Sequence, residues 1–414
     1  MAPYSLTATL ARFAEGIRGD FLSPSLKAQT GRLFLDFLGV SARGMMSPST
    51  QALLGAFADM GLDEGPLPLI ATRRRASATE AAFVHGLAAH SLELDDLHNS
   101  SSLHPAVVVF PAALAAAQLS GASPGALMAA VVAGYEVATR LGEAANPATH
   151  YERGFHPTAT CGVFGSATAA GKLLGLDAEG LARAWGISGS MASGSMAFLS
   201  GDSWTKHLNA GWAAKAGITA AVLARREFRS PKDIIEGPLG FLHSYAEEPR
   251  PDLLTDGLGE RWAVEATSFK PHACCRYMQP GIDALIALSK EHDVKTDEVA
   301  SVTVHCLPAG FLIIAEPCEH KMNPQATAEA QFSMPYGAAV ALARRRAGLE
   351  EFGEEALKDP AVRKLTGKVR CVKSEELGKL WPKKWAGQVE VETTDGRPHP
   401  PGGRPQRRPD QSLH

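Results

Sequence analysis

The chain has 414 residues, of which 45% are hydrophobic and 21% are charged, and its formal net charge is −3. This length allows two domains of about 100–200 residues each, and the composition is that of a globular protein with a sizeable core. A net charge so close to zero predicts neither nucleic-acid nor membrane binding, so an acidic substrate must be attracted by a local cluster of cations.

The remaining bulk features predict a cytoplasmic protein. Segment 1–20 has no apolar run behind an early positive charge, so it is not a signal peptide, and no segment approaches the roughly 20 apolar residues of a membrane span. The six cysteines include no CxxC pair, which indicates neither a disulfide scaffold nor a zinc or iron–sulfur site. We therefore expect no membrane partner, no nucleic-acid partner and no metal.

Residues 1–262 are predicted to form an all-helical domain. Apolar residues recur at helical spacing over 33–38, after a candidate N-cap at Ser23 or Ser25. Later helices are apolar on most of their surface, which is typical of helices buried inside a large helical domain. Their predicted ranges are 106–119, 126–141, 162–174 and 211–225.

Residues 263–395 are predicted to form a smaller α+β domain. Apolar and polar residues alternate over 299–306 and again over 389–393, as in half-buried strands. Helices are predicted over 281–290 and 326–346. The predicted fold class is therefore mainly α with a smaller α+β domain.

The last segment, residues 396–414, is predicted to be a disordered tail. A turn at Asp395-Gly396 should lead into a return strand. The sequence that follows is instead rich in proline and arginine, and it reads RPHPPGGRPQRRPDQSLH. Prolines cannot donate the hydrogen bonds of a strand ladder, and the segment has no apolar alternation.

The first of four polar clusters that interrupt the apolar sequence spans residues 90–105. It contains Glu93, Asp95, Asp96, His98 and His104. Carboxylates beside imidazoles suit proton transfer, because the acid orients the ring and stabilises its charged form. The alternative interpretation is a helix end followed by a solvated loop. Aspartate and histidine could also bind a metal ion, but no HExxH-type spacing supports this.

Two clusters lie at predicted helix N-termini, where free N–H groups attract anions. In 151–167, His156 directly precedes Pro157, and Thr158 or Thr160 could cap the helix; the alternative is a cap with an incidental histidine. In 200–217, Lys206 and His207 precede a glycine that opens a helical run. Lys206 could hold a carboxylate there, and the alternative is a surface lysine.

The fourth cluster, at 268–288, contains Lys270, His272, Arg276 and Tyr277 near the predicted domain junction. The guanidinium of Arg276 suits bidentate carboxylate binding, and domain junctions often house ligand sites. The alternative interpretation is a solvated linker. Neither a P-loop nor a GxGxxG motif after a strand occurs, so no nucleotide cofactor is predicted.

Taken in order, these clusters resemble the MmgE/PrpD family, which includes 2-methylcitrate dehydratase, cis-aconitate decarboxylase and iminodisuccinate epimerase. The resemblance covers about residues 5–395, and its motifs include AAFVHGLAAHSLELDD, GFHPTATCGVFGSATAAGKLLGLD, TKHLNAGWAAKAG, SFKPHACCRYM and AQFSMPYGAAVAL. It implies a large helical domain with a smaller α+β lid, a homodimer, and an active site in the cleft between the domains, without metal or organic cofactor. The residues that match the family's motifs are Asp95, His104, His156, Lys206, Lys270 and Tyr336.

The chain departs from the family pattern in two places. Glu93 stands where aspartate is common, and Leu97 and His98 follow the acidic pair where threonine or tryptophan is common. The presence of Leu97 and His98 at these positions weakens the resemblance to the decarboxylase. After the Asp-Gly turn, the proline- and arginine-rich tail replaces the family's return strand and closing helix, as a truncation or a frame shift would produce.

The predicted reaction starts from negative charge that develops beside a carboxylate, which fixed cations stabilise in the transition state. The substrate is expected to be a small di- or tricarboxylic acid. We assign carboxylate binding to Lys206, Lys270 and Arg276, further substrate binding to His98, general acid–base roles to His104 or His156, ring orientation to Asp95, and proton donation to Tyr336.

Three reactions share this intermediate, namely dehydration, epimerisation and decarboxylation. We rank dehydration first because it is prevalent in the family, so the sequence predicts a 2-methylcitrate dehydratase-like hydro-lyase, with epimerisation second. The alternative from another class is a catalytically decayed, carboxylate-binding paralogue, and a purely helical scaffold is a third possibility.

Overall fold

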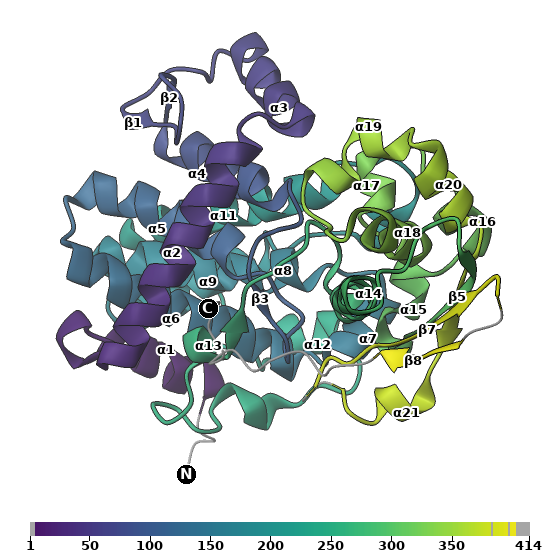
Figure 1. The fold of residues 1–414 in the computed structure, drawn as a ribbon. Helices are drawn as coiled ribbons and strands as arrows, with labels where there is room; N and C mark the ends of the chain where they lie inside the picture. Colours follow the sequence, from purple (N-terminus) through teal and green to yellow (C-terminus); the bar gives the residue numbers. More distant parts are fainter. Residues whose placement is uncertain (1–4, 382–383, 396–397, 403–414) are drawn as a thin grey trace. The chain divides into compact units, whose positions relative to one another are not determined.

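A computed structural model describes residues 5–381, 384–395 and 398–402 (Figure 1). Contacts divide the chain into two units: Met1–Ala197 with Trp204–Phe269, and Phe198–Ser203 with Lys270–His414. The segment that precedes Lys270 stays with the first unit because its strand β4 (Thr267–Ser268) pairs antiparallel with β3 (Leu97–His98).

The first unit is helical apart from short two-stranded sheets in the part of the chain that the structure describes. Its first small sheet pairs β1 (Leu67–Pro68) with β2 (Arg75–Ala76). Its helices are α1 (Leu6–Gly16), α2 (Pro24–Gly44), α3 (Pro48–Asp59), α4 (Ala78–His90), α5 (Ala106–Ser120), α6 (Pro124–Ala144), α7 (Pro147–Glu152), α8 (Pro157–Thr160), α9 (Gly162–Leu173), α10 (Ala178–Gly189), α11 (Thr205–Arg225), α12 (Phe241–Tyr245) and α13 (Ala263–Ala266).

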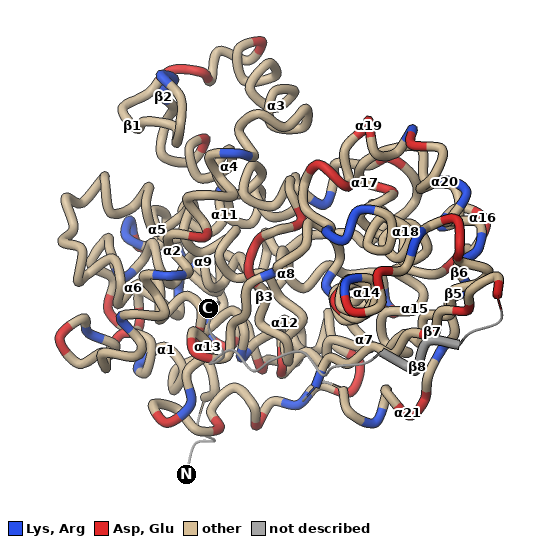
Figure 2. The backbone as a smooth tube through the Cα atoms, viewed as in Figure 1, with Lys and Arg blue, Asp and Glu red and all other residues tan. Residues whose placement is uncertain are grey.

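The core of this unit is built by helices that are apolar on most of their surface, as predicted. Helix α9 packs against α5, α6 and α11, and α4 packs against α5 and α11. In Figure 2 helix α5 has no Lys, Arg, Asp or Glu, which fits its burial among these neighbours. The predicted cap is also confirmed, because the Ser23 side chain accepts from the Leu26 N–H at the start of α2. Within the described ranges, no helix combines the length and apolar character that a bilayer span requires.

Helices α4 and α11 approach each other through glycine. A Cβ atom added to Gly86 would lie 2.9 Å from the Cα of Gly211, and one added to Gly211 would lie 2.5 Å from the carbonyl oxygen of Phe83. Only hydrogen fits at such distances, so the two main chains pack directly on each other. This contact fixes the spacing between His90 at the end of α4 and Lys206 at the start of α11.

The second unit contains a four-stranded sheet in the order β6-β5-β7-β8. Strands β5 and β6 are parallel, and the other two pairs are antiparallel. The bounds are β5 (Val299–Cys306), β6 (Val369–Lys373), β7 (Gln388–Thr393) and β8 (Pro398–Gly402). The alternation predicted from the sequence is confirmed, because Val302, Val304 and Cys306 are buried on one face of β5.

Helices complete the second unit. Helix α14 contacts β5, β7 and β8, while α18 contacts α14 and β6. The helices of the unit are α14 (Gln279–Glu291), α15 (Pro308–Ile314), α16 (Cys318–Met322), α17 (Thr327–Ala330), α18 (Met334–Arg344), α19 (Glu354–Leu357), α20 (Pro360–Thr366) and α21 (Glu375–Gly378). The fold class predicted from the sequence, mainly helical with a smaller α/β part, is thereby confirmed.

Two local predictions for this unit are wrong. The helix predicted over 326–346 is divided into α17 and α18, because the Ser333 side chain accepts from the Tyr336 N–H and starts a new helix at Met334. The predicted disordered tail also includes a strand, since β8 pairs with β7. Prolines are compatible with β8 because it is an edge strand, with β7 as its partner in the described sheet. Residues 396–397 and 403–414 of the predicted tail lie outside the described residues.

Candidate active site

The segment that connects α4 to α5 carries the first predicted cluster, and it is buried. Asp95 and Asp96 have no exposed surface, and Glu93, His98 and His104 are at most 8% exposed. The alternative interpretation of this segment as a solvated loop is therefore wrong. Polar side chains buried to this extent need hydrogen-bond partners, and the partners define the site.

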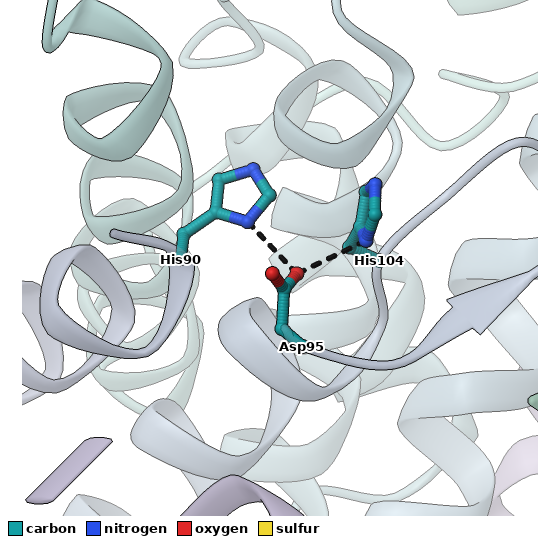
Figure 3. A group of neighbouring side chains, drawn as sticks. All are labelled: His90, Asp95 and His104. Carbon is teal, nitrogen blue, oxygen red and sulfur yellow. Dashed lines mark hydrogen bonds and ion pairs between the residues drawn. The ribbon is translucent and has the colours of Figure 1, made fainter. Parts of the chain in front are cut away.

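Asp95 lies between two imidazole rings (Figure 3). Its Oδ2 is 2.8 Å from Nδ1 of His90 and 3.0 Å from Nδ1 of His104. Nδ1 of His104 also lies 2.7 Å from the main-chain carbonyl oxygen of Asp96. A carbonyl oxygen can only accept, so Nδ1 of His104 must carry the hydrogen, and in the neutral ring the basic lone pair is on Nε2.

The two rings differ in exposure and in proton affinity. The His104 side chain is 10% exposed, whereas that of His90 is fully buried. Burial, together with the positive charge of Lys206, lowers the pKa of His90 to about 3, so this ring is neutral at physiological pH. Nε2 of His90 is buried and has no hydrogen-bond partner among the described residues. Such an unsatisfied atom in a polar cluster is a candidate for ligand contact.

His156 completes a group of three histidines. Its ring stacks on that of His90, with centroids 5.7 Å apart and planes 14° apart, and the ring of His90 meets that of His104 edge to face at 5.1 Å. Burial lowers the pKa of His156 well below its usual range. His156 is itself the N-cap of α8, so neither Thr158 nor Thr160 has the capping role predicted for it. The Thr158 hydroxyl instead accepts from the His104 main-chain N–H.

Lys206 is buried in the first turn of α11 and forms an ion pair with Glu93. The surface-lysine interpretation is therefore wrong, and α11 begins before the glycine that was predicted to open it. Glu93 has a positive φ of 55°, a conformation that is uncommon for a residue other than glycine. The carboxylate that Lys206 holds in this structure is thus one of the protein's own.

Asp96 and His98 belong to other hydrogen-bonded groups. Asp96 accepts from the Tyr135 hydroxyl and from the Ala106 N–H at the start of α5, and burial raises its pKa well above its usual range. It therefore anchors the connecting segment to α5 and α6. Nδ1 of His98 is 2.9 Å from the Ser101 hydroxyl, and burial lowers the pKa of His98 to about 4.

The remaining predicted residues belong to the second unit. Lys270 and Arg276 are both buried, which excludes the solvated-linker interpretation of their segment. The Arg276 guanidinium lies 5.4 Å from the ring centroid of Trp385, and burial lowers its pKa to about 10. Tyr336 is fully buried, and its hydroxyl donates to the Glu351 carbonyl oxygen at 2.8 Å. The hydroxyl hydrogen of Tyr336 is thus used in a hydrogen bond to the main chain, which argues against its predicted role as a proton donor to the substrate.

Family models match most of the chain. The MmgE/PrpD N-terminal domain matches residues 8–254, and the MmgE/PrpD C-terminal domain matches residues 272–400. The chain belongs to the MmgE/PrpD family. The resemblance inferred from the sequence motifs is thereby confirmed.

Curated relatives in the MmgE/PrpD family are named as decarboxylases. A cis-aconitate decarboxylase-like protein of Aspergillus oryzae is 28% identical over 95% of this chain and 84% of its own length. A cis-aconitate decarboxylase of Aspergillus terreus is 26% identical with the same coverage. The Homo sapiens cis-aconitate decarboxylase is 28% identical over 88% of this chain and 76% of its own length. At this identity the relatives support a lyase-type enzyme at the level of the family.

His90 is the site residue that the sequence analysis of this MmgE/PrpD chain missed. It opens the segment HSLELDD, but it is also the last residue of α4 and follows an apolar helix. The available signal was its spacing, because a histidine at a helix end can turn back to an acid five residues later, as His90 does to Asp95.

One atom each from His90, Asp95 and His104 lies within 4.8 Å of the others, close enough to be tested as a metal site. The short contact between Nδ1 of His104 and the Asp96 carbonyl oxygen places a hydrogen on that nitrogen, so Nδ1 of His104 cannot bind an ion in this arrangement. In this arrangement the three groups fit a hydrogen-bonded triad.

Proposed function

We propose that this MmgE/PrpD protein is a lyase that acts on a small di- or tricarboxylic acid, with His104 as its main proton-transfer group. The observation that carries the proposal is the fixed tautomer of His104, whose Nδ1–H is held by Asp95 and by the Asp96 carbonyl oxygen. This arrangement leaves Nε2 as the basic atom and puts a carboxylate behind the ring, which stabilises the imidazolium that forms when Nε2 takes a proton.

The neighbouring groups support this role. His90 donates to the same Asp95 oxygen and is neutral, so it orients the carboxylate without adding a positive charge. Lys206 supplies the fixed cation for a substrate carboxylate, which must replace Glu93 as the partner of its ammonium group. His156, stacked on His90, is the candidate for the second proton transfer. Lys270 and Arg276 stay predicted carboxylate ligands, and His98 stays a predicted substrate-binding residue.

Two reactions are candidates. In decarboxylation, the bond to a carboxylate breaks, carbon dioxide leaves, and the electron pair left on carbon takes a proton. In dehydration, a base removes a proton from carbon, and hydroxide leaves the adjacent carbon with its bonding pair. The names of the relatives favour decarboxylation, with cis-aconitate as the first substrate to test. Dehydration of 2-methylcitrate, predicted from the sequence, is the second.

The test is turnover of cis-aconitate, 2-methylcitrate and iminodisuccinate by the purified protein in heavy water, followed by mass spectrometry. Release of carbon dioxide with one deuterium on the product identifies decarboxylation. A new alkene that absorbs in the ultraviolet identifies dehydration, and deuterium exchange without loss of mass identifies epimerisation of iminodisuccinate.

The residue assignment is tested with His104→Ala beside His243→Ala, which replaces an exposed histidine of the same unit. We expect His104→Ala to lower kcat by about 100- to 10,000-fold and His243→Ala to retain wild-type rates. Wild-type rates in His104→Ala would remove the assignment. Binding of the acids without turnover by the unsubstituted protein would favour the decayed paralogue. The homodimer, the cytoplasmic location and the absence of metal and cofactor stay predictions.

A further inference from the structure

A small cavity within the second unit is lined by residues that have no role assigned above. It has a volume of about 40 Å³, and its walls include Phe198 and Leu199 from the 198–203 segment and Phe332 from the segment between α17 and α18. The rings of Phe198 and Phe332 are 6.2 Å apart. Two charged residues also line the cavity, namely Lys321 in α16 and Glu329 in α17 (Thr327–Ala330).

Lys321 is more than nine-tenths buried, with 8% of its surface exposed. No hydrogen bond or ion pair of its ammonium group is found among the described residues, unlike Lys206, which is paired with Glu93. Burial lowers the pKa of Lys321, while the nearby Glu329 and Cys275 raise it; the exposed His320 also lines the cavity. A buried ammonium group that donates no hydrogen bond is unfavourable unless a ligand completes the site.

The half-buried carboxylate of Glu329 is already engaged elsewhere. Its Oε2 accepts from the Gln325 main-chain N–H at 2.6 Å, next to the start of α17. Glu329 thus changes the electrostatic potential at Lys321 but does not accept a hydrogen bond from it. The cavity therefore combines apolar rings, a carboxylate that already accepts from the main chain, and a cation that has hydrogens left to donate.

We propose that this cavity is a carboxylate-binding subsite in which the ammonium group of Lys321 holds the anion. The volume supports a group of this size, because one water-sized position needs about 10–15 Å³, and a carboxylate has three heavy atoms. A whole tricarboxylic acid is too large, so the remainder of the ligand projects through the opening of the cavity. The choice of a carboxylate among anions rests on the proposed function.

The probe for this subsite is tricarballylate, which has neither a hydroxyl group to lose nor a double bond, so that binding is measured without turnover. Isothermal titration compares the wild-type protein with Lys321→Met, which keeps the aliphatic chain and removes the charge. We expect Lys321→Met to bind about 10- to 100-fold more weakly, as is typical for the loss of a hydrogen bond to a charged group. Lys290→Met, at an exposed lysine of α14, is the matched control and should bind like wild type.

Two further measurements separate the possible outcomes. If the carboxylate belongs to the lyase substrate, Lys321→Met raises KM and the wild-type protein binds one equivalent. If it belongs to a separate acid, the wild-type protein binds two equivalents and Lys321→Met binds one, with KM unchanged. Carbon-13 NMR of reductively methylated wild-type protein reports Lys321 directly, and its signal should shift on addition of tricarballylate, even if Lys321→Met does not fold.

Equal stoichiometry and affinity in wild type and Lys321→Met, or an unshifted Lys321 signal, would overturn the inference. Lys321-dependent binding by a protein that turns over none of the acids would instead refute the proposed function and leave this subsite in place.

Discussion

Replacing His85 by glutamine tests whether the buried imidazoles of α4 are neutral, on which the roles of His90 and Asp95 depend. His85 is 3% exposed, its Nε2 accepts from the Ile70 N–H at 3.0 Å, and burial lowers its pKa to about 4. The Oε1 atom of a glutamine can accept the same N–H but does not titrate. The substitution thus removes one proton-binding group and keeps the hydrogen bond.

The magnitude follows from linkage. Between pH 6.5 and pH 4 the unfolded chain binds a proton at His85 and the folded chain does not, so the stability contributed by the neutral ring is lost as the pH falls. With an unfolded pKa of about 6.5, lowering the pH from 7.5 to 5.5 costs the folded state about 1 kcal/mol through this one residue. His85→Gln should therefore be less destabilising at pH 5.5 than at pH 7.5 by about 1 kcal/mol.

The assay is urea unfolding of both proteins at the two pH values. Taking the difference between the proteins at each pH cancels the other titrating groups, including Asp96, whose raised pKa acts in the opposite direction. An equal cost of the substitution at both pH values would mean that His85 titrates normally in the folded protein. The case for neutral buried rings would then fail for the neighbouring His90 as well.

Three further substitutions test the packing and pairing around the site. Glu93→Gln should lower the free energy of unfolding by about 3–5 kcal/mol, because it removes the carboxylate from a buried ion pair, and a change below 1 kcal/mol in urea unfolding would contradict the importance of the pair. Tyr336→Phe should retain kcat and cost about 1 kcal/mol by leaving the Glu351 carbonyl oxygen unsatisfied, whereas a 100-fold loss of kcat would restore its role as an acid. Gly211→Ala should lower the free energy of unfolding by about 1–3 kcal/mol or more and reduce kcat, because the added methyl group forces α11 away from the main chain of α4. An unchanged Tm would refute the close contact between the two helices.

The sequence predicted the helix over 106–119 from its long apolar run and the strand over 299–306 from its alternation, because both patterns reflect burial of the element itself. It also identified the acidic and histidine-rich segment that contains Asp95 and His104. It could not indicate that Glu93 pairs with Lys206, since the two residues are 113 positions apart and only the packing of α4 on α11 brings them together.

Other differences have the same origin in tertiary contacts. Tyr336 matches a family motif, but its hydroxyl is committed by the position of Glu351, which local sequence does not specify. His90 was overlooked because an apolar helix normally ends without a functional group. Strand β8 was missed because proline-rich sequence is a poor strand former except at a sheet edge, and only the completed sheet defines which strand is at the edge.

The ion pair between Lys206 and Glu93 makes the proposed enzyme selective for negatively charged ligands. A ligand can pair with the Lys206 ammonium group only if it displaces the negatively charged carboxylate of Glu93. Esters and half-amides of the same acid, although similar in shape, offer only a neutral oxygen and should be turned away at this position. Only a ligand group whose interaction with the Lys206 ammonium group is at least as favourable as that of Glu93 can therefore bind at this position.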